Sequence, residues 1–64
     1  MASFAERANF TSADLRGADF SQARLANARF SNANLGNVNF SDALMVSVDM
    51  RSARMSKTNL TGAN

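Results

Sequence analysis

Five acidic side chains are the residues of this chain best suited to acid–base or metal chemistry: Glu6, Asp14, Asp19, Asp42 and Asp49. Their spacing along the chain does not match that of a metal-binding cluster. The sequence contains no His and no Cys, which excludes a histidine-based triad and a thiol nucleophile. Its three glycines are scattered and form no phosphate-binding loop. We therefore expect a protein that is not an enzyme, with no cofactor, no metal site and no small-molecule substrate.

Charge and hydropathy restrict the partners in the same way. Seven Lys or Arg residues against five acidic ones give a formal net charge of +2. The basic side chains gather locally at Arg51, Arg54 and Lys57, but no aromatic side chain is free beside them to stack on a base. The sequence shows no run of about 18 apolar residues and no secretory signal pattern. We expect a cytoplasmic protein without a nucleic-acid partner or a membrane span.

These side chains are set on a repeat of five residues. From Ala8 to Leu60 every fifth residue is large and apolar, and a small residue lies two positions before it. The large residues are Phe10, Leu15, Phe20, Leu25, Phe30, Leu35, Phe40, Met45, Met50, Met55 and Leu60. The small ones are Ala8, Ala13, Ala18, Ala23, Ala28, Ala33, Val38, Ala43, Val48, Ala53 and Thr58. Only Met1, Phe4 and Leu44 among the Phe, Leu and Met residues lie outside the phase, so the repeat is not a by-product of an apolar composition.

A period of five fits neither a helix nor a flat strand. Five residues of α-helix end about 140° away from the starting direction, so no apolar stripe forms. In a strand, residues an odd number apart lie on opposite faces. Every fifth side chain points inward only if the whole chain turns at each repeat. Four such turns close a square coil of about twenty residues, and stacked coils form a solenoid with an apolar axis.

The residues around each large apolar one favour corners. The preceding position is often Asn or Asp, as listed here: Asn9, Asp14, Asp19, Asn34, Asn39, Asp49 and Asn59. The two following positions are mostly small or polar, as in Thr11-Ser12 and Gly36-Asn37. Such side chains tolerate turn dihedrals and bond their own backbone. The local composition therefore agrees with a corner at every fifth residue.

The segments Ala13-Asp14-Leu15-Arg16-Gly17-Ala18-Asp19-Phe20 and Ala33-Asn34-Leu35 resemble the tandem units of the pentapeptide-repeat family. The resemblance runs from about Ala8 to Asn64 and implies an all-β fold, a right-handed quadrilateral β-helix, here of under three coils. We assign residues 1–7 to an N-terminal lead-in or cap and residues 8–64 to the β-helix. The departures from the family pattern are Arg24, Arg29, Leu44 and Arg54 before the central residue, and Val38, Val48 and Thr58 at the small position.

Stacking residues twenty apart predicts columns in the core. Phe10 should lie over Phe30, and Phe20 over Phe40, at a spacing of about 4.8 Å. On the outer surface Arg29 should lie against Asp49, one coil further on, as a surface ion pair.

Two apolar residues occupy positions that are polar elsewhere. Leu44 and Val46 flank Met45 and should point outward, with Ala26 one coil below. The plainest interpretation is two isolated surface hydrophobes. The functional alternative is a contact surface for a protein partner or a second copy of the chain.

The coil ends are the other candidate contact. The chain stops in mid-repeat at Asn64, so either it belongs to a longer array or another chain covers its last coil. Residues at the ends are Phe4, Met50, Met55 and Leu60. We expect Phe4 to fold over the open end as a cap, the alternative being a frayed terminus. A homodimer is the favoured assembly, through Leu44 and Val46 or through the ends.

These features predict a rigid, non-enzymatic scaffold that serves as a structural or protein–protein interaction module. The resemblance offers an alternative, because some quinolone-resistance members of the family mimic duplex DNA and bind DNA gyrase. That role implies a longer, strongly acidic rod dimerised through a C-terminal helix. The positive net charge of this chain argues against it.

Overall fold

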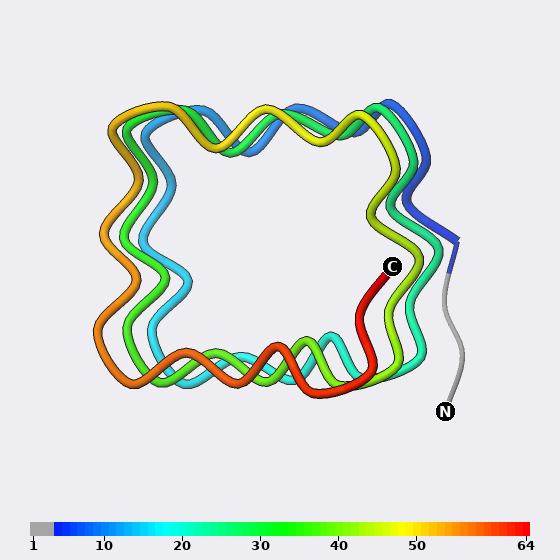
Figure 1. Ribbon diagram of the computed structural model, residues 1–64. Helices are drawn as coiled ribbons and strands as arrows, with labels where there is room; N and C mark the ends of the chain where they lie inside the picture. Colours follow the sequence, from blue (N-terminus) through cyan, green and yellow to red (C-terminus); the bar gives the residue numbers. More distant parts are fainter. Residues whose placement is uncertain (1–3) are drawn as a thin grey trace.

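The computed structural model describes residues 4–64 of the protein. Over these residues the backbone forms no helix, and its pairing consists of isolated parallel bridges at every fifth residue. Each bridge joins residues twenty positions apart, from Phe4 with Arg24 to Asn39 with Asn59. The chain is therefore a β-helix-like solenoid, and its stacked coils superimpose as a four-sided outline when viewed along the axis (Figure 1).

Backbone hydrogen bonds join each coil to the next in a repeating pattern. The Phe10 N–H donates to the Arg29 carbonyl at 2.7 Å, and the Arg29 N–H donates back to the Ala8 carbonyl at 2.8 Å. The same exchange recurs one coil further on between Phe30, Asp49 and Ala28. A single coil cannot satisfy its own backbone in this way, so stability depends on neighbouring coils. The body formed measures 23 × 22 × 16 Å.

The corners are turns with a left-handed residue. At one corner the Ala13 N–H donates to the Phe10 carbonyl at 3.0 Å, and Ser12 between them has a φ of 62°. A positive φ at the third residue is the signature of a type II turn. The residues with positive φ recur every five positions: Arg7, Ser12, Gly17, Gln22, Asn27, Asn32, Asn37, Asp42, Ser47, Ser52, Lys57 and Gly62. Gly and Asn tolerate this conformation best, which explains their place in the repeat.

The core lies in the middle coil and has the predicted columns. Its buried residues are Ala23, Leu25, Ala28, Phe30, Ala33, Leu35, Val38, Phe40 and Ala43. The rings of Phe10 and Phe30 stack with centroids 4.9 Å apart, and those of Phe20 and Phe40 stack at 5.4 Å. The two stacks meet edge to face, with 5.7 Å between the centroids of Phe30 and Phe40. The twenty-residue register expected from the sequence is thus confirmed.

The first described residues differ from expectation. Phe4 pairs with Arg24 as part of the ladder, and the Ala5 N–H donates to the Arg24 carbonyl at 2.8 Å. The Phe4 ring is 73% exposed on the outside of the coil, so it does not cap the end of the core. Pairing therefore begins at Phe4 rather than at Ala8, and residues 4–64 make about three coils instead of under three. The rest of the predicted lead-in, residues 1–3, lies outside the described range.

Candidate protein-interaction surface

One side of the solenoid carries apolar side chains on its outer surface. It contains residues 4–6, 24–26 and 44–46 and forms the right-hand side in Figure 1. We call Phe4, Ala26, Leu44 and Val46 the apolar face. Phe4 is 73% and Val46 49% exposed, whereas Ala26 and Leu44 are half-buried. The predicted candidates Leu44, Val46 and Ala26 therefore lie on one side, and Phe4 joins them.

The backbone ladder holds these side chains outward. The Leu44 N–H donates to the Ala23 carbonyl at 2.9 Å, and the Leu44 carbonyl accepts from the Leu25 N–H at 2.8 Å. The Val46 carbonyl accepts from the Asn27 N–H at 2.9 Å. With its backbone bonded to the middle coil, Leu44 cannot turn inward, because Met45 already occupies the core position. The apolar face is thus a fixed surface.

At most other repeats, the position equivalent to Leu44 holds a polar residue with a hydrogen-bonding role. Where it is Asn or Asp, the side-chain oxygen accepts a hydrogen bond from the N–H two residues later, for example from Ser41 to Asn39 at 2.9 Å. Seven residues at this position make the bond: Asn9, Asp14, Asp19, Asn34, Asn39, Asp49 and Asn59. The turn chemistry expected of them is confirmed. Phe4, Arg24 and Leu44 have no such acceptor, so these three positions of the apolar side lack this bond.

Charge near the apolar face is sparse. Arg24 lies between Phe4 and Leu44 in the ladder, and its guanidinium carbon is 5.3 Å from the centre of the Phe4 ring. This is a cation–π distance, and at an exposed site it contributes about 0.5–1 kcal/mol. Glu6 is the acidic residue on the same side. The surface therefore combines apolar atoms with one basic and one acidic group.

The ion pairs of the described residues lie on other sides. Arg16 contacts Asp14 with 2.7 Å between Nη2 and Oδ2, and Arg51 contacts Asp49 at 2.9 Å. The hydrogen bonds from Arg51 lower the pKa of Asp49 to about 2. The predicted pairing of Arg29 with Asp49 is wrong, since these residues are bridged through their backbones but the carboxylate bonds Arg51. Arg51 is two residues from Asp49 on the same side of the same coil, so it reaches the carboxylate without crossing to another coil.

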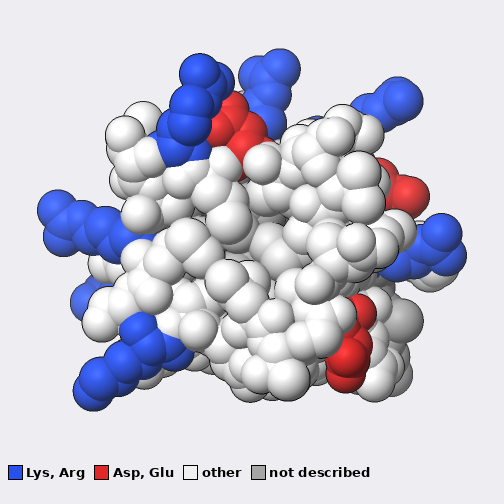
Figure 2. Space-filling model, in the orientation of Figure 1, with Lys and Arg blue, Asp and Glu red and all other residues white. Residues whose placement is uncertain are grey.

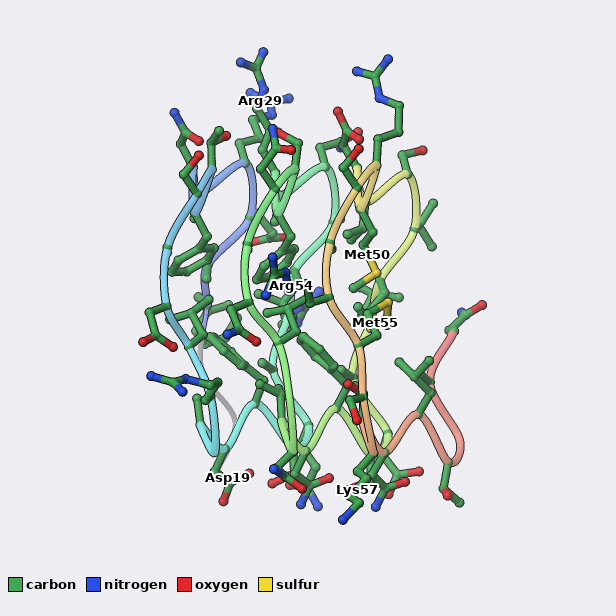
Figure 3. The ribbon with its side chains drawn as sticks, turned by 90° about the vertical axis from the view of Figure 1, so that its left-hand side faces the viewer. Asp19, Arg29, Met50, Arg54, Met55 and Lys57 are labelled. Atoms are coloured by element: carbon green, nitrogen blue, oxygen red, sulfur yellow. The ribbon has the colours of Figure 1, made fainter. Side chains whose placement is uncertain are left out.

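Three of the four residues predicted for the coil ends, Met50, Met55 and Leu60, belong to other sides of the solenoid than the apolar face. Met50 and Met55 are partly buried against the core, and Leu60 is 44% exposed. Figure 3 shows both methionines directed into the solenoid near its C-terminal end. Figure 2 views that end, where uncharged atoms fill the centre and charged side chains project from the rim. Phe4, grouped with these residues in the prediction, belongs to the apolar face instead.

Sequence reasoning missed Phe4 as a surface residue, although the signal was present. Phe4 stands twenty residues before Arg24 and forty before Leu44, so the same register that stacks the core also stacks this outer column. Phe4 does not fit the five-residue phase of the core residues, but it does fit the phase of the outward-facing residues Arg24 and Leu44.

Two other features, a metal-binding cluster and a membrane-spanning helix, are absent from residues 4–64. These residues contain no group of His, Cys, Asp and Glu side chains arranged to hold a metal ion. None of the described backbone forms a helix that is long and apolar enough to cross a membrane.

Comparison with known proteins agrees with the geometry. A family model described as pentapeptide repeats matches the chain over residues 6–42 and 23–64, with 8 copies of the repeat. Together these matches span most of the sequence. No curated protein sequence matches the chain.

Proposed function

Because the chain belongs to the pentapeptide-repeat family, we propose that it is a rigid, non-enzymatic module that acts by binding protein. The first partner we propose is a second copy of the chain. The observation that carries this proposal is the apolar face, where Phe4, Leu44 and Val46 stand on outward positions that other sides fill with polar residues.

Rigidity is supported by the way the coils are joined. Hydrogen bonds of 2.6–3.0 Å join the backbones of neighbouring coils on all four sides. A surface built on such a ladder loses little conformational freedom when it binds, which favours association. We also infer the right-handed, four-sided form of the coil, supported by the family resemblance and by the path of the chain in Figure 1.

A second copy fits the apolar face by symmetry and by charge. With a two-fold axis parallel to the solenoid axis, Leu44 of one copy faces Val46 of the other, and the reverse contact forms as well. The same arrangement places Arg24 one coil away from Glu6 of the opposite copy, a distance that its long side chain can span. One operation thus joins Leu44 to Val46 and brings basic and acidic groups of opposite sign near each other.

The size of the face predicts a weak complex. The body is 16 Å long in its shortest dimension and 22–23 Å across in the other two. A stable interface buries about 800 Å² on each partner, which is more than one side of so small a body offers. We therefore expect a dimer that dissociates on dilution, with a dissociation constant in the range of about micromolar or weaker.

The test is sedimentation velocity over a dilution series with the wild type and with Leu44→Asn/Val46→Ser. The amide introduced by Leu44→Asn would accept the N–H of residue 46, as the other Asn residues of the ladder do, and Ser is common at the position of Val46. The double variant should therefore remain folded while losing the apolar surface. Arg54→Asn is the matched control, since it adds the same hydrogen bond on another side and leaves the apolar face intact.

We expect the wild type and Arg54→Asn to dimerise at high concentration and the double variant to stay monomeric. A wild type that is monomeric at every concentration would overturn the dimer. A dimer that survives in the double variant would place the contact away from the apolar face.

A further inference from the structure

A second surface lies at the corner that follows the apolar side. A hollow there is lined by four residues, Arg7, Asn9, Asn27 and Arg29. All four are exposed and polar, and two are basic. Figure 3 shows Arg29 extending outward from the solenoid. Figure 2 shows Lys and Arg side chains projecting from the upper edge, which holds residues 9, 29 and 49.

The fold brings these four residues together from two neighbouring coils. Arg7 and Asn27 are the left-handed residues of stacked corners, with φ values of 62° and 63°. Asn9 and Arg29 are bridged to each other on the side that follows. The Arg7 N–H donates to the Ala26 carbonyl at 2.9 Å, which fixes one corner on the other. The hollow is therefore framed by paired backbone.

The side chains around the hollow offer mainly hydrogen-bond donors. The Oδ1 atom of Asn9 already accepts from the Thr11 N–H at 3.0 Å, which leaves the amide NH₂ of Asn9 to donate outward. Neither Arg7 nor Arg29 forms an ion pair within residues 4–64. Each guanidinium carries five N–H donors in a planar fork.

Within residues 4–64 the acidic neighbours of the hollow form no ion pair with its two Arg residues. Asp49, which is bridged to Arg29 from the next coil, bonds both Nε and Nη2 of Arg51. Glu6 precedes Arg7 in the chain and forms no ion pair in the described structure. Two Arg residues thus line the hollow, and neither is paired with a carboxylate in the described structure.

We propose that this corner hollow, defined by Arg7, Asn9, Asn27 and Arg29, binds a phosphate group. Guanidinium forks match the oxygens of a phosphate in geometry and charge, and amide donors complete the coordination. The site is separate from the apolar face, and it binds its ligand whether or not the chain dimerises. Free phosphate and a phosphate monoester share this chemistry and are distinguished by the titration.

The experiment is an NMR titration of the uniformly ¹⁵N-labelled protein with inorganic phosphate and, in parallel, with phenyl phosphate at constant ionic strength. We expect saturable shifts of the Asn9 and Asn27 side-chain amides and of the Arg7 and Arg29 Nε signals. A tighter curve for phenyl phosphate identifies an esterified ligand, and a tighter curve for inorganic phosphate identifies the free ion.

The test variant is Arg7→Gly/Arg29→Asn, which follows the preferences of the repeat. Gly suits the positive φ of residue 7, and Asn at residue 29 would accept the Ser31 N–H, so the fold is preserved. The matched control Lys57→Gly/Arg54→Asn changes the same two kinds of position and removes the same charge at another corner.

We expect binding to weaken at least about tenfold in the test variant, since two charge-assisted contacts are lost, and to remain nearly unchanged in the control. Equal weakening in both variants would show that the protein attracts phosphate only through its net charge and would overturn the site. Shifts that do not saturate, or that avoid Asn9 and Asn27, would overturn it as well.

Discussion

The hydroxyl group of Thr58 donates a hydrogen bond of 2.8 Å to the backbone carbonyl of Leu35 in the coil below. Thr58 occupies the small inward position of the repeat, where Ala is the usual residue. The same carbonyl also accepts the Val38 N–H at 3.1 Å, so it serves two donors. A polar side chain is tolerated on the inner surface because its donor is satisfied.

Thr58→Ala and Thr58→Ser separate the hydroxyl from the methyl group. The serine variant keeps the donor, whereas the alanine variant loses it, and a typical hydrogen bond contributes about 1 kcal/mol. We expect the alanine variant to unfold about 1 kcal/mol more easily than the serine variant. Urea unfolding followed by far-UV circular dichroism measures the difference, since the chain has no Trp or Tyr for fluorescence. Equal stability of the two variants would show that the bond contributes nothing.

Phe30 should be the most sensitive aromatic position. It is fully buried between the stacked ring of Phe10 and the edge of Phe40. Phe30→Ala leaves a cavity and should cost about 3–5 kcal/mol, which is enough to unfold a domain of this size. Phe4→Ala is the control, because Phe4 is 73% exposed and its loss should cost less than about 1 kcal/mol. Thermal melting of both variants measures the two losses of stability. Similar losses for Phe30→Ala and Phe4→Ala would contradict the burial pattern.

Much of the fold could be predicted because the repeat constrains both of its surfaces. One register places Phe10 over Phe30 in the core and Asn9 over Arg29 outside it. The hydrogen bonds of the Asn and Asp side chains also followed from local chemistry, because each involves an N–H only two residues away. Periodicity and short-range bonding are written in the sequence and need no knowledge of the tertiary structure.

The remaining features depend on side-chain conformation or on the register of the first residues. Asp49 had two basic neighbours, and nothing in the repeat says that Arg51 rather than Arg29 reaches its carboxylate. The corner hollow arises where two guanidinium groups leave neighbouring coils, and long side chains have many rotamers. The core phase alone does not place Phe4, because Phe4 belongs to the outer column of the ladder, where it pairs with Arg24.

Gly17 and Gly36 should respond in opposite ways to alanine. Gly17 has a φ of 76°, which an L-residue adopts at a cost of about 1 kcal/mol, although its side faces open space. Gly36 is not among the residues with positive φ, and an added Cβ would make ordinary contacts of 3.5–3.8 Å. We therefore expect Gly17→Ala to destabilise by about 1 kcal/mol and Gly36→Ala to be neutral or to stabilise by up to about 1 kcal/mol.

Urea midpoints of the two variants measured side by side provide the check. Gly62 offers a third comparison, because it also has a positive φ of 71° but a Cβ there would collide with the Asp42 side chain. Gly62→Ala should therefore cost at least as much as Gly17→Ala. A Gly17→Ala protein as stable as the wild type would contradict the type II geometry of the corners.

Acid should weaken the fold through its ladder carboxylates. The pKa of Asp49 falls from 3.8 to about 2 because it accepts hydrogen bonds from the Arg51 side chain and backbone, and those of Asp14 and Asp19 are lowered by their bonds to Arg16 and Ser21. Groups with a depressed pKa stabilise the folded state above the unfolded pKa, so this stability is present above about pH 4 and is lost as the pH falls toward about 2.

The triple variant Asp14→Asn/Asp19→Asn/Asp49→Asn keeps an oxygen to accept each backbone N–H but cannot titrate. We expect its free energy of unfolding to depend less on pH between about 4 and 2 than that of the wild type, as measured by urea unfolding at several pH values. Parallel pH profiles for the two proteins would show that other groups govern the acid transition.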